Sequence, residues 1–489
     1  MREKINRFIN STKDFPVISA LAAGFFPLIH YYSFNLTLAD SQIQLVFLVS
    51  FFLILPVIMM LFFRIILKQT KINFYIIPVL NYMLFGIFIS IVLLGLKFKY
   101  IVAIAVVTFL LGVFGYKFLK KIIVFQYLLG LLSLCFLVPK LVGYFNYSNT
   151  WLEQDDNIML AEFKQKPNIY FIQVDGYANF SALKEQPYSF DNSDFETFLG
   201  TNGFKFYDDF RSNYYSTLSS NASMFAMKHH YYFKPNDVFA ELHNARKVVV
   251  SDNPVLSILK HNNYKTFLIC ESSYFLTNRP KLSYDFTNIE NNQLSFFGHK
   301  TNKDKKDIRT DLKTAILENK DTNNFFFIQK MSPQHIRYHQ LPSDKMEEER
   351  NDYLERLNVA NNWLTEMIDF ITKTDDNALI VIHADHGGYV GFNSMAELVI
   401  KQTDKALVNS IYSSILAIKW PENKAPVFDE NIKSSVNIFR ILVSYLSKNT
   451  DYLNHLQPDK SYIVIDKGAP FGVYEYLNDK GELVFNKFE

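Results

Sequence analysis

The sequence predicts a helical membrane domain with five spans, followed by an α/β domain with a largely parallel central sheet. Two observations carry this prediction. Apolar residues crowd the first ~145 positions of the 489-residue chain, while charged and amide residues fill the rest. Beyond those positions, short apolar runs alternate with longer helical patterns, which is typical of a parallel sheet covered by helices. We therefore expect a transmembrane domain over 1–145 and a second domain over 146–489.

Five apolar stretches make up the predicted membrane domain. Each is close to the ~20 residues that cross ~30 Å of hydrocarbon, although the fourth is short. A cleaved signal peptide explains one such stretch but not five. The stretches are Phe15–Leu36, Ile43–Phe63, Phe74–Leu96, Tyr100–Tyr116 and Ile122–Tyr144.

Basic residues predict the orientation of these spans. Four precede the first span, and three lie in each of the connections after the second and the fourth span. The connection near Asp40 has none, and that near Lys97 has two. Because basic residues collect on the cytoplasmic side, we expect the N-terminus in the cytoplasm and everything beyond about Asn146 outside the cytoplasmic (inner) membrane. A miscount at the weak fourth span would reverse that placement.

Several other features are interpreted without a catalytic role. Polar residues in the spans, such as His30 and Asn81, are more simply helix-packing or interfacial side chains than the lining of a lipid path. A net charge of +2 argues against a nucleic-acid binder. The cysteines, Cys135 in the fifth span and Cys270 in an apolar run, are not expected to pair. The Asn/Lys-rich patch at 291–306 is interpreted as a solvated loop.

Five short apolar runs beyond the spans are expected to be buried strands. The clearest of the helical patterns between them covers 347–373, where apolar residues recur at helical spacing. Ligands of parallel sheets gather beyond the carboxyl ends of the strands, so polar residues there are the first candidates for a site. The five runs are 168–174, 265–269, 324–329, 378–383 and 414–418.

Carboxylates and imidazoles follow three of these runs. Asp175 follows the first, His335 and His339 follow the third, and Asp385 with His386 follows the fourth. An Asp together with an adjacent Asp-His pair is an oxygen and nitrogen ligand set suited to Zn²⁺ or Mn²⁺. A single Asp at a strand end is more often a helix cap. The coincidence of three strand ends at one edge favours a metal site.

A metal site of this kind needs a reacting group, and the segment 212–227 offers several hydroxyls. It is expected to be a turn leading into a helix whose N-terminal amides would favour a bound phosphate. A hydroxyl beside a metal ion loses its proton more easily and becomes a usable nucleophile. A Ser/Thr-rich helix cap without chemistry explains this segment equally well on its own. Glycines after the strand-ending acids, Gly176, Gly387 and Gly388, would let the backbone turn tightly and approach a ligand.

Six segments carry a family resemblance. In chain order they are PNIYFIQVDGYANF, SNYYSTLSSNASMF, MSPQHIRYH, IHADHGG, SILAIKWPE and SSVNIFRILVSYL. They resemble the successive blocks of membrane-anchored sulfatase-like hydrolases and transferases of the alkaline phosphatase superfamily, which include lipoteichoic acid synthases and phosphoethanolamine transferases. The resemblance covers about 168–445 and implies an alkaline phosphatase/sulfatase-like fold for the second domain. The Asp-His-Gly block is its most specific single motif.

The resemblance implies roles for five residues. One divalent metal ion, Zn²⁺ or Mn²⁺, would be held by Asp175, Asp385 and His386. Thr217 would be both a further metal ligand and the catalytic nucleophile. His335 would contact the phosphate or the leaving group of the substrate.

Two departures from the family pattern narrow the activity. The C/S-x-P-x-R motif of sulfatases is absent, since STLSSNA has neither Pro nor Arg, which argues against sulfate-ester hydrolysis. Phosphoethanolamine transferases tend to carry a further His beyond the Asp-His-Gly block, but GYVGFNSMAELV has none, which counts against a second metal ion. His339 matches no family position and is interpreted as a surface residue.

The sequence thus predicts a metal-dependent transferase acting on lipids. Thr217 would take a phosphoglycerol or phosphoethanolamine headgroup from a membrane phospholipid and pass it to an envelope glycan or lipid; Ser216 and Ser219 are the next candidates for the nucleophile. A lipid donor is favoured because no nucleotide pool is expected outside the cytoplasmic membrane. Two alternatives stay open. One is a phosphodiesterase or phosphatase with water as the acceptor; the other, disfavoured by the complete ligand set, is a non-catalytic protein that binds a glycan or a partner.

Overall fold

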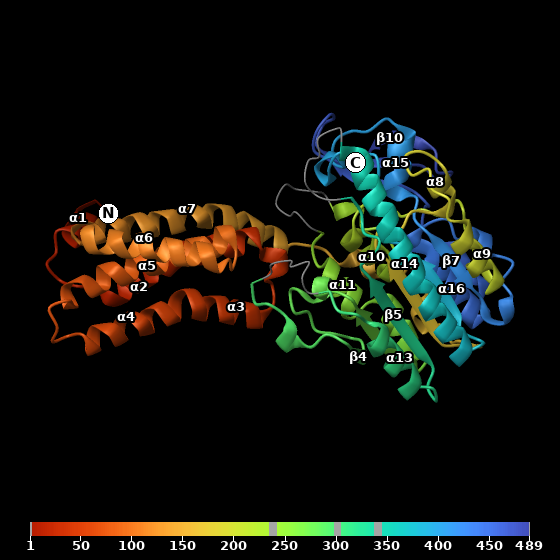
Figure 1. Cartoon of the computed structure of the whole chain (residues 1–489), viewed down its shortest axis with the longest axis horizontal. Coiled ribbons are helices and arrows are strands. Elements are labelled where there is room, and N and C mark those ends of the chain that lie inside the picture. Colours follow the sequence, from red (N-terminus) through yellow and green to blue (C-terminus); the bar gives the residue numbers. More distant parts are fainter. Residues whose placement is uncertain (1, 234–241, 298–304, 337–344, 489) are drawn as a thin grey trace. The chain divides into compact units, whose positions relative to one another are not determined.

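The computed structural model describes residues 2–233, 242–297, 305–336 and 345–488, and Figure 1 shows their helices and strands. The chain divides into two compact units, and each is described by itself. The first contains 1–147 and two short later segments, 277–279 and 294–300; the second contains the remainder. The boundary near residue 146 between the two predicted domains stays a prediction, because the first unit also contains residues that lie more than 100 positions after it in the chain.

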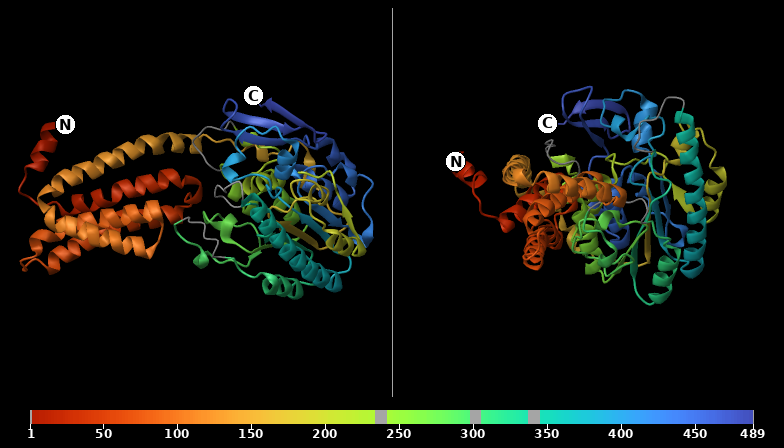
Figure 2. Two further views of the ribbon diagram at one scale, coloured as in Figure 1. Left: turned by 45° about the horizontal axis from the view of Figure 1, so that its top comes forward. Right: turned by 60° about the vertical axis from the view of Figure 1, so that its left-hand side comes forward.

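All five predicted spans form helices, and among the described residues four helices are long and apolar enough to cross a membrane. The helix of the predicted fourth span, α6 (Phe98–Phe114), has 17 residues and packs along α5, so its length falls short of a full span. Figure 2 shows these helices from two further directions. The four long helices are α2 (Pro16–Phe34), α3 to α4 (Gln42–Ile66), α5 (Asn73–Leu94) and Tyr116–Leu152, which includes α7 (Leu119–Phe145). The short helix α1 (Arg2–Ile9) precedes them. The orientation, which depends on the fourth span, remains a prediction.

Polar contacts inside this first unit join its helices. Asn81 on α5 is fully buried, exchanges hydrogen bonds of 3.0 Å with the amide of Gln126 on α7, and donates one of 2.7 Å to the carbonyl of Ser19 on α2. In hydrocarbon such a side chain needs an internal partner, and here it has two. The helix-packing interpretation of Asn81 is therefore confirmed.

The interpretation of 291–306 as a solvated loop is correct for the exposed residues 291–293, 305 and 306, but it is wrong at Leu294 and Phe297, which are buried. Phe297 is only 5% exposed, and its ring packs edge-on to Tyr31 and Phe52 in the first unit at centroid distances of 5.6 and 6.2 Å. Phe296 stacks on Phe47 at 4.4 Å. The Asn/Lys composition of the patch predicts solvent exposure, but these two adjacent aromatic rings remove apolar surface from water by packing among others.

A seven-stranded sheet forms the centre of the second unit, with the order β2-β7-β6-β1-β5-β3-β4. The strands from β6 to β4 pair in parallel, and β7 and β2 add two antiparallel pairs at one side. The largely parallel sheet that the sequence predicts is therefore confirmed. Its strands are β1 (Ile169–Val174), β2 (Phe204–Phe206), β3 (Lys265–Cys270), β4 (Phe286–Thr287), β5 (Asn324–Lys330), β6 (Leu379–His383) and β7 (Leu416–Lys419).

Helices of the second unit bury their apolar sides on this sheet. The longest is α14 (Met346–Thr374), whose Leu357, Leu364 and Met367 are fully buried in the same core as the strands. A separate antiparallel sheet of order β10-β9-β8 follows at the C-terminal end. The remaining elements are α8 (Phe180–Lys184), α9 (Ser193–Thr201), α10 (Thr217–Ala226), α11 (Ala245–Val250), α12 (Pro254–His261), α13 (Arg309–Glu318), α15 (Lys405–Tyr412), α16 (Ile438–Ser447), β8 (Ser461–Ile465), β9 (Gly472–Leu477) and β10 (Leu483–Lys487).

The register of the three central strands brings their carboxyl ends to one level. Gln173 of β1 pairs with Gln329 of β5 and with His383 of β6. Asp175 and Asp385 each follow two residues after a member of this row, so both acids leave the sheet side by side. The expectation that three strand ends share one edge is correct for β1, β5 and β6.

Candidate metal centre

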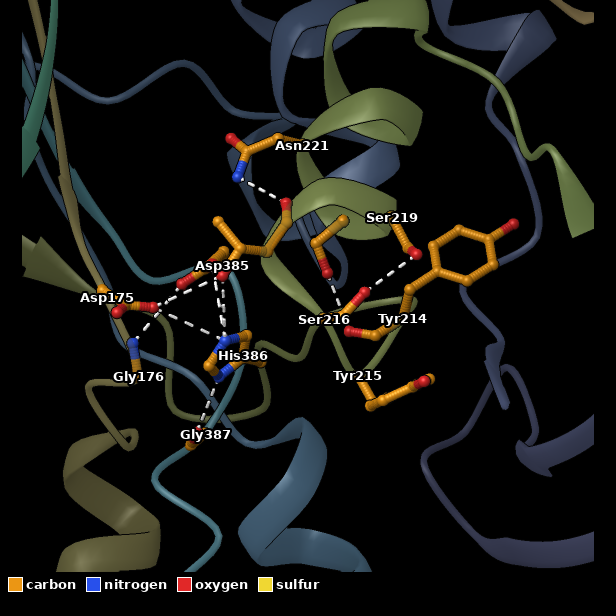
Figure 3. Close-up of polar contacts among 12 residues, drawn as sticks. Asp175, Gly176, Tyr214, Tyr215, Ser216, Ser219, Asn221, Asp385, His386 and Gly387 are labelled. Atoms are coloured by element: carbon orange, nitrogen blue, oxygen red, sulfur yellow. Dashed lines mark hydrogen bonds and ion pairs between the residues drawn. The ribbon is translucent and has the colours of Figure 1, made fainter. Parts of the chain in front are cut away.

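Asp175, Asp385 and His386 form a buried cluster beyond the carboxyl ends of β1 and β6. Each side chain offers a ligand atom that lies within 4.8 Å of the other two. The three residues are 3%, 0% and 1% exposed. Figure 3 shows them converging from two loops. The structure thus brings together three of the residues that the sequence singled out as metal ligands.

The imidazole of His386 is oriented toward the two carboxylates. Its Nδ1–H donates to the carbonyl of Gly387 at 2.8 Å, which leaves the lone pair on Nε2. That Nε2 lies 3.5 Å from Asp175 Oδ1 and 3.5 Å from Asp385 Oδ2. A backbone carbonyl that fixes the tautomer of a histidine is a common companion of metal ligation.

The charges of this cluster fit a single divalent cation. No described residue donates a hydrogen bond to the buried Oδ2 of Asp385. Burial raises the pKa of Asp385 to about 6, and the nearby negative charge of Asp175 acts in the same direction. A cation bound by both carboxylates and the Nε2 lone pair would compensate the buried charge and use the orphaned oxygen. The oxygen and nitrogen donors are those that Zn²⁺ and Mn²⁺ accept.

Thr217 is the hydroxyl that faces this cluster. It is the first residue of α10, and its Oγ1 lies 3.5 Å from Asp175 Oδ1 and 3.4 Å from His386 Nε2. Ser216 instead donates to Ser219 at 2.9 Å, so these two hydroxyls bond to each other. The segment is a turn followed by a helix, as the sequence predicts, and Thr217 rather than either serine faces the cluster.

The chain around Thr217 is fixed by its own helix. Asn221, one turn further along α10, donates from its amide to the carbonyl of Thr217 at 2.8 Å. The backbone N–H of Ser220 donates to the carbonyl of Ser216 at 2.9 Å, but because α10 begins at Thr217, the amides of the three residues before Ser220 have no carbonyl partner four residues earlier within the helix. These amides point toward the same end of the helix, where a negatively charged phosphate is stabilised by the helix dipole.

His335 lies beside the cluster on the loop after β5. Its ring centroid is 5.9 Å from that of His386, and its Nδ1–H donates to the carbonyl of Ile336 at 2.6 Å. Burial lowers the pKa of His335, so the ring is neutral at pH 7 with its lone pair on Nε2. His339 lies outside the described residues.

Arg356, a residue that the sequence did not single out, supports the His335 loop. Its guanidinium on α14 donates to the carbonyls of Pro333 and His335 at 2.8 and 3.3 Å. The backbone N–H of Gln334 also donates to the carbonyl of Asp175 at 2.8 Å. The long helical pattern places Arg356 on α14, but only the fold brings this position to the loop.

Glycines allow the loop after β6 to pack closely against other parts of the protein. From the sequence we expect them instead to let the backbone approach a ligand. A Cβ on Gly387 would lie 2.2 Å from the carbonyl oxygen of Ser410, and one on Gly388 would lie 2.4 Å from the ring of Tyr353. The neighbours are therefore parts of the protein rather than a ligand. At Gly176, whose φ is +68°, the turn itself also favours glycine.

Comparison with known proteins places this architecture beside several solved structures. No family model matches the chain, and no curated protein does so either. The C-terminal periplasmic domain of EptC from Escherichia coli is similar over 65% of this chain and 94% of its own length, with 12% identity and a TM-score of 0.44. The lipooligosaccharide phosphoethanolamine transferase A (EptA) from Neisseria meningitidis is similar over 88% of this chain and 95% of its own, with 13% identity and a TM-score of 0.39.

A third similar structure comes from Listeria monocytogenes. The lipoteichoic acid synthase LtaP from Listeria monocytogenes is similar over 67% of this chain and 91% of its own, with 15% identity and a TM-score of 0.40. These proteins are of the kind that the sequence motifs resemble. At such identities and TM-scores the likeness by itself assigns neither an activity nor a substrate to this chain.

Proposed function

We propose that the protein is a membrane-anchored phosphotransferase that moves a phosphoglycerol or phosphoethanolamine headgroup from a membrane phospholipid to an envelope glycan or lipid. The observation that carries this proposal is the placement of the Thr217 hydroxyl 3.4–3.5 Å from a buried Asp-Asp-His cluster at the start of a helix. A nucleophile, a cation site and a phosphate-binding helix end then meet at one point.

Thr217 attacks phosphorus in the first step of the proposed reaction. A bond forms between Thr217 Oγ1 and the phosphorus atom, the bond from phosphorus to the diacylglycerol oxygen breaks, and diacylglycerol leaves with one proton. In the second step an acceptor hydroxyl attacks the same phosphorus and displaces the threonine oxygen, which regains a proton. The headgroup is thus transferred without net change in the number of phosphoester bonds.

The other residues of the site hold ions and protons. Asp175, Asp385 and His386, with Thr217 as a further ligand, would hold one Zn²⁺ or Mn²⁺ ion. Such an ion supplies positive charge that favours the deprotonated threonine and offsets charge on the phosphate oxygens. His335, neutral and with its lone pair on Nε2, is suited to accept a proton and return it to the leaving oxygen.

A lipid donor follows from the apolar helices that precede the site. Four helices long and apolar enough to cross a membrane come before the catalytic unit in the chain, and α7 ends at Phe145, only 24 positions before β1 begins at Ile169. With the second unit on the extracytoplasmic side, which the basic residues predict, phospholipid is the activated phosphate compound at hand.

The experiment that tests this function is peptide mass spectrometry on the full-length protein in detergent with mixed bacterial phospholipids and Mn²⁺ or Zn²⁺. We expect a headgroup adduct on the peptide that contains Thr217, with a mass that separates phosphoglycerol from phosphoethanolamine, and release of diacylglycerol. Thr217→Ala should abolish the adduct and lower turnover roughly 10³-fold or more, as removal of a nucleophile does. Ser219→Ala is the matched control and should keep the adduct.

Two results would count against this proposal. An adduct that persists in Thr217→Ala would move the nucleophile to Ser216 or Ser219. Diacylglycerol release without any acceptor, together with a free headgroup phosphate, would indicate that water is the acceptor and that the protein is a hydrolase. Absence of both adduct and diacylglycerol in the wild-type protein would rule out a phospholipid donor.

A further inference from the structure

Tyr389 contacts two imidazoles of the candidate site with one ring. It follows His386 by three residues and is fully buried. Its ring centroid lies 4.8 Å from that of His386 and 5.2 Å from that of His335, with interplanar angles of 22° and 23°. The centroids of the two imidazoles are themselves 5.9 Å apart, so each of the three rings is a neighbour of the other two. One aromatic ring thus packs against both the metal-ligating and the substrate-facing histidine.

Two hydrogen bonds, one from the hydroxyl and one from the backbone N–H, anchor Tyr389 to neighbouring segments. Its hydroxyl donates to the carbonyl of Tyr215, two residues before Thr217, and its backbone N–H donates to the carbonyl of Ser410 at 3.1 Å. Figure 3 shows Tyr215 leading into the segment that carries the nucleophile. Burial, with the charges of Asp385 and Asp175, raises the pKa of Tyr389 well above its ordinary value, so the hydroxyl remains a donor.

The backbone conformation at this position indicates a constraint beyond simple packing. Tyr389 has a φ of +58°, in the left-handed region that a residue with a Cβ rarely adopts. A glycine would relieve this strain but would remove the ring and the hydroxyl. The chain instead keeps a large aromatic residue at the place where its ring contacts both histidines and its hydroxyl reaches Tyr215.

We propose that Tyr389 is a positioning residue: its ring holds the imidazole planes of His386 and His335, and its hydroxyl holds the turn that leads into Thr217. This inference rests on the proposed function for the roles of those three residues. The His386 ring makes hydrogen bonds only at its edge, from Nδ1 to the carbonyl of Gly387 at 2.8 Å and between Nε2 and the Thr217 hydroxyl at 3.4 Å, and the second of these is long enough to leave the ring some freedom to rotate. The stacked phenol restricts this rotation, and so fixes the direction of Nε2 toward the two carboxylates.

The ring and the hydroxyl have separable consequences. Loss of the ring frees both imidazoles and is expected to weaken metal binding, because groups that orient a ligand typically contribute 10–100-fold to metal affinity. Loss of the hydroxyl alone leaves the stacking intact but releases the carbonyl of Tyr215. That change acts on Thr217 and is expected to lower the rate of adduct formation while metal affinity stays the same.

Three variants of the full-length protein in detergent test this inference. The quantities to measure are the dissociation constants for Zn²⁺ and Mn²⁺, by calorimetry, and the rate constant and half-saturating lipid concentration for formation of the headgroup adduct on Thr217. Tyr389→Leu should raise the metal dissociation constant about 10–100-fold. Tyr389→Phe should keep the metal dissociation constant and lower the rate constant without changing the half-saturating lipid concentration. Tyr476→Leu removes an equally buried ring from the C-terminal sheet, and should lower thermal stability but leave both measurements unchanged.

Each outcome supports or overturns the proposal. Wild-type metal affinity in a folded Tyr389→Leu variant overturns the role of the ring, and a wild-type rate in Tyr389→Phe overturns the role of the hydroxyl. If Tyr389→Leu does not fold, Tyr389→Met, which keeps an apolar side chain without the ring, takes its place in the metal titration, and Tyr389→Phe still decides the role of the hydroxyl. A wild-type protein that binds the metal ion but forms no adduct contradicts the proposed function instead, and metal affinity then still tests the ring.

Discussion

At the scale of single residues, the loop after β6 depends on the absence of a side chain at Gly387. The space beside its Cα is filled by the carbonyl of Ser410 at the end of α15, and backbone of this kind cannot rotate away as a flexible side chain would. The same loop carries Asp385 and His386. Close packing of Gly387 therefore fixes the positions of two of the side chains in the candidate metal centre at once.

Gly387→Ala is expected to lower metal affinity at least about tenfold, because the added Cβ must push the ligand loop away from α15 by an ångström or more. Calorimetric titration with Zn²⁺ measures this. The control is Gly200→Ala on α9, where a Cβ meets nothing within 4 Å. In a helix that change should stabilise the protein by about 0.5–1 kcal/mol and leave metal affinity unchanged. Equal Zn²⁺ affinities in Gly387→Ala and Gly200→Ala would contradict the steric argument.

The site residues that could be predicted from sequence are those that follow strands. Asp175, Asp385 and His386 come directly after apolar runs, so the sheet topology alone brings them together. Arg356 and Tyr389 could not be predicted in the same way. Their roles depend on which side of α14 faces the His335 loop and on where a left-handed turn directs one side chain, and neither is encoded in a local pattern.

At the scale of elements, the start of α10 is supported by two neutral histidines. His230 accepts a hydrogen bond at Nδ1 from the backbone N–H of Tyr232, and its Nε2–H donates to the carbonyl of Ser219 in the first turn of α10. His229 donates to the carbonyl of Pro458 at 2.8 Å, and its Nδ1 accepts from the hydroxyl of Tyr214. Burial lowers the pKa of His229 to about 4 and that of His230 to about 3.

These histidines make stability fall as pH falls. In the unfolded chain each titrates near pH 6.5, so between about pH 6.5 and its own lower folded-state value the unfolded state binds more protons. Within that window each histidine therefore lowers the free energy of unfolding by about 1.4 kcal/mol for every unit by which the pH falls. Above about pH 6.5 it has no such effect. Denaturant unfolding of the full-length protein between about pH 7 and 5 measures the total slope. His230→Gln keeps a donor toward Ser219 and should reduce the slope by one proton, while an unchanged slope would mean that His230 is already protonated in the folded state.

Long elements of the fold could be predicted, and short ones could not. The five buried runs and the 29-residue α14 carry enough consecutive apolar or periodic positions to be recognised. In contrast, β2 and β4 have three and two residues, and they form only because β7 and β3 present free edges to them. Their structure is imposed by partners that lie far away in the sequence.

At the scale of the whole molecule, the first unit is completed by residues from the middle of the chain. Gln44 donates to the carbonyl of Thr277 at 3.2 Å, and Asn278 donates to Asp40 at 2.9 Å. The buried ring of Phe297, about 150 positions beyond the end of α7 in the chain, belongs to the same unit. Sequence reasoning assigned this stretch to a loop because its composition is polar, and the pairing of distant segments is not visible in composition.

Phe297→Ala is therefore expected to destabilise the first unit by about 3 kcal/mol or more, since it removes a buried aromatic side chain from a packed cluster. Hydrogen exchange measured by mass spectrometry should show faster exchange in peptides from Gln42–Val49, where Phe47 contacts this ring at 5.5 Å. Phe286→Ala is the matched control, because Phe286 is 42% exposed and belongs to the second unit. If exchange in Gln42–Val49 stays at the wild-type rate in both variants, the aromatic contact of Phe297 does not stabilise the helices. Faster exchange in Phe297→Ala alone would establish that a segment between β4 and α13 is part of the folded first unit.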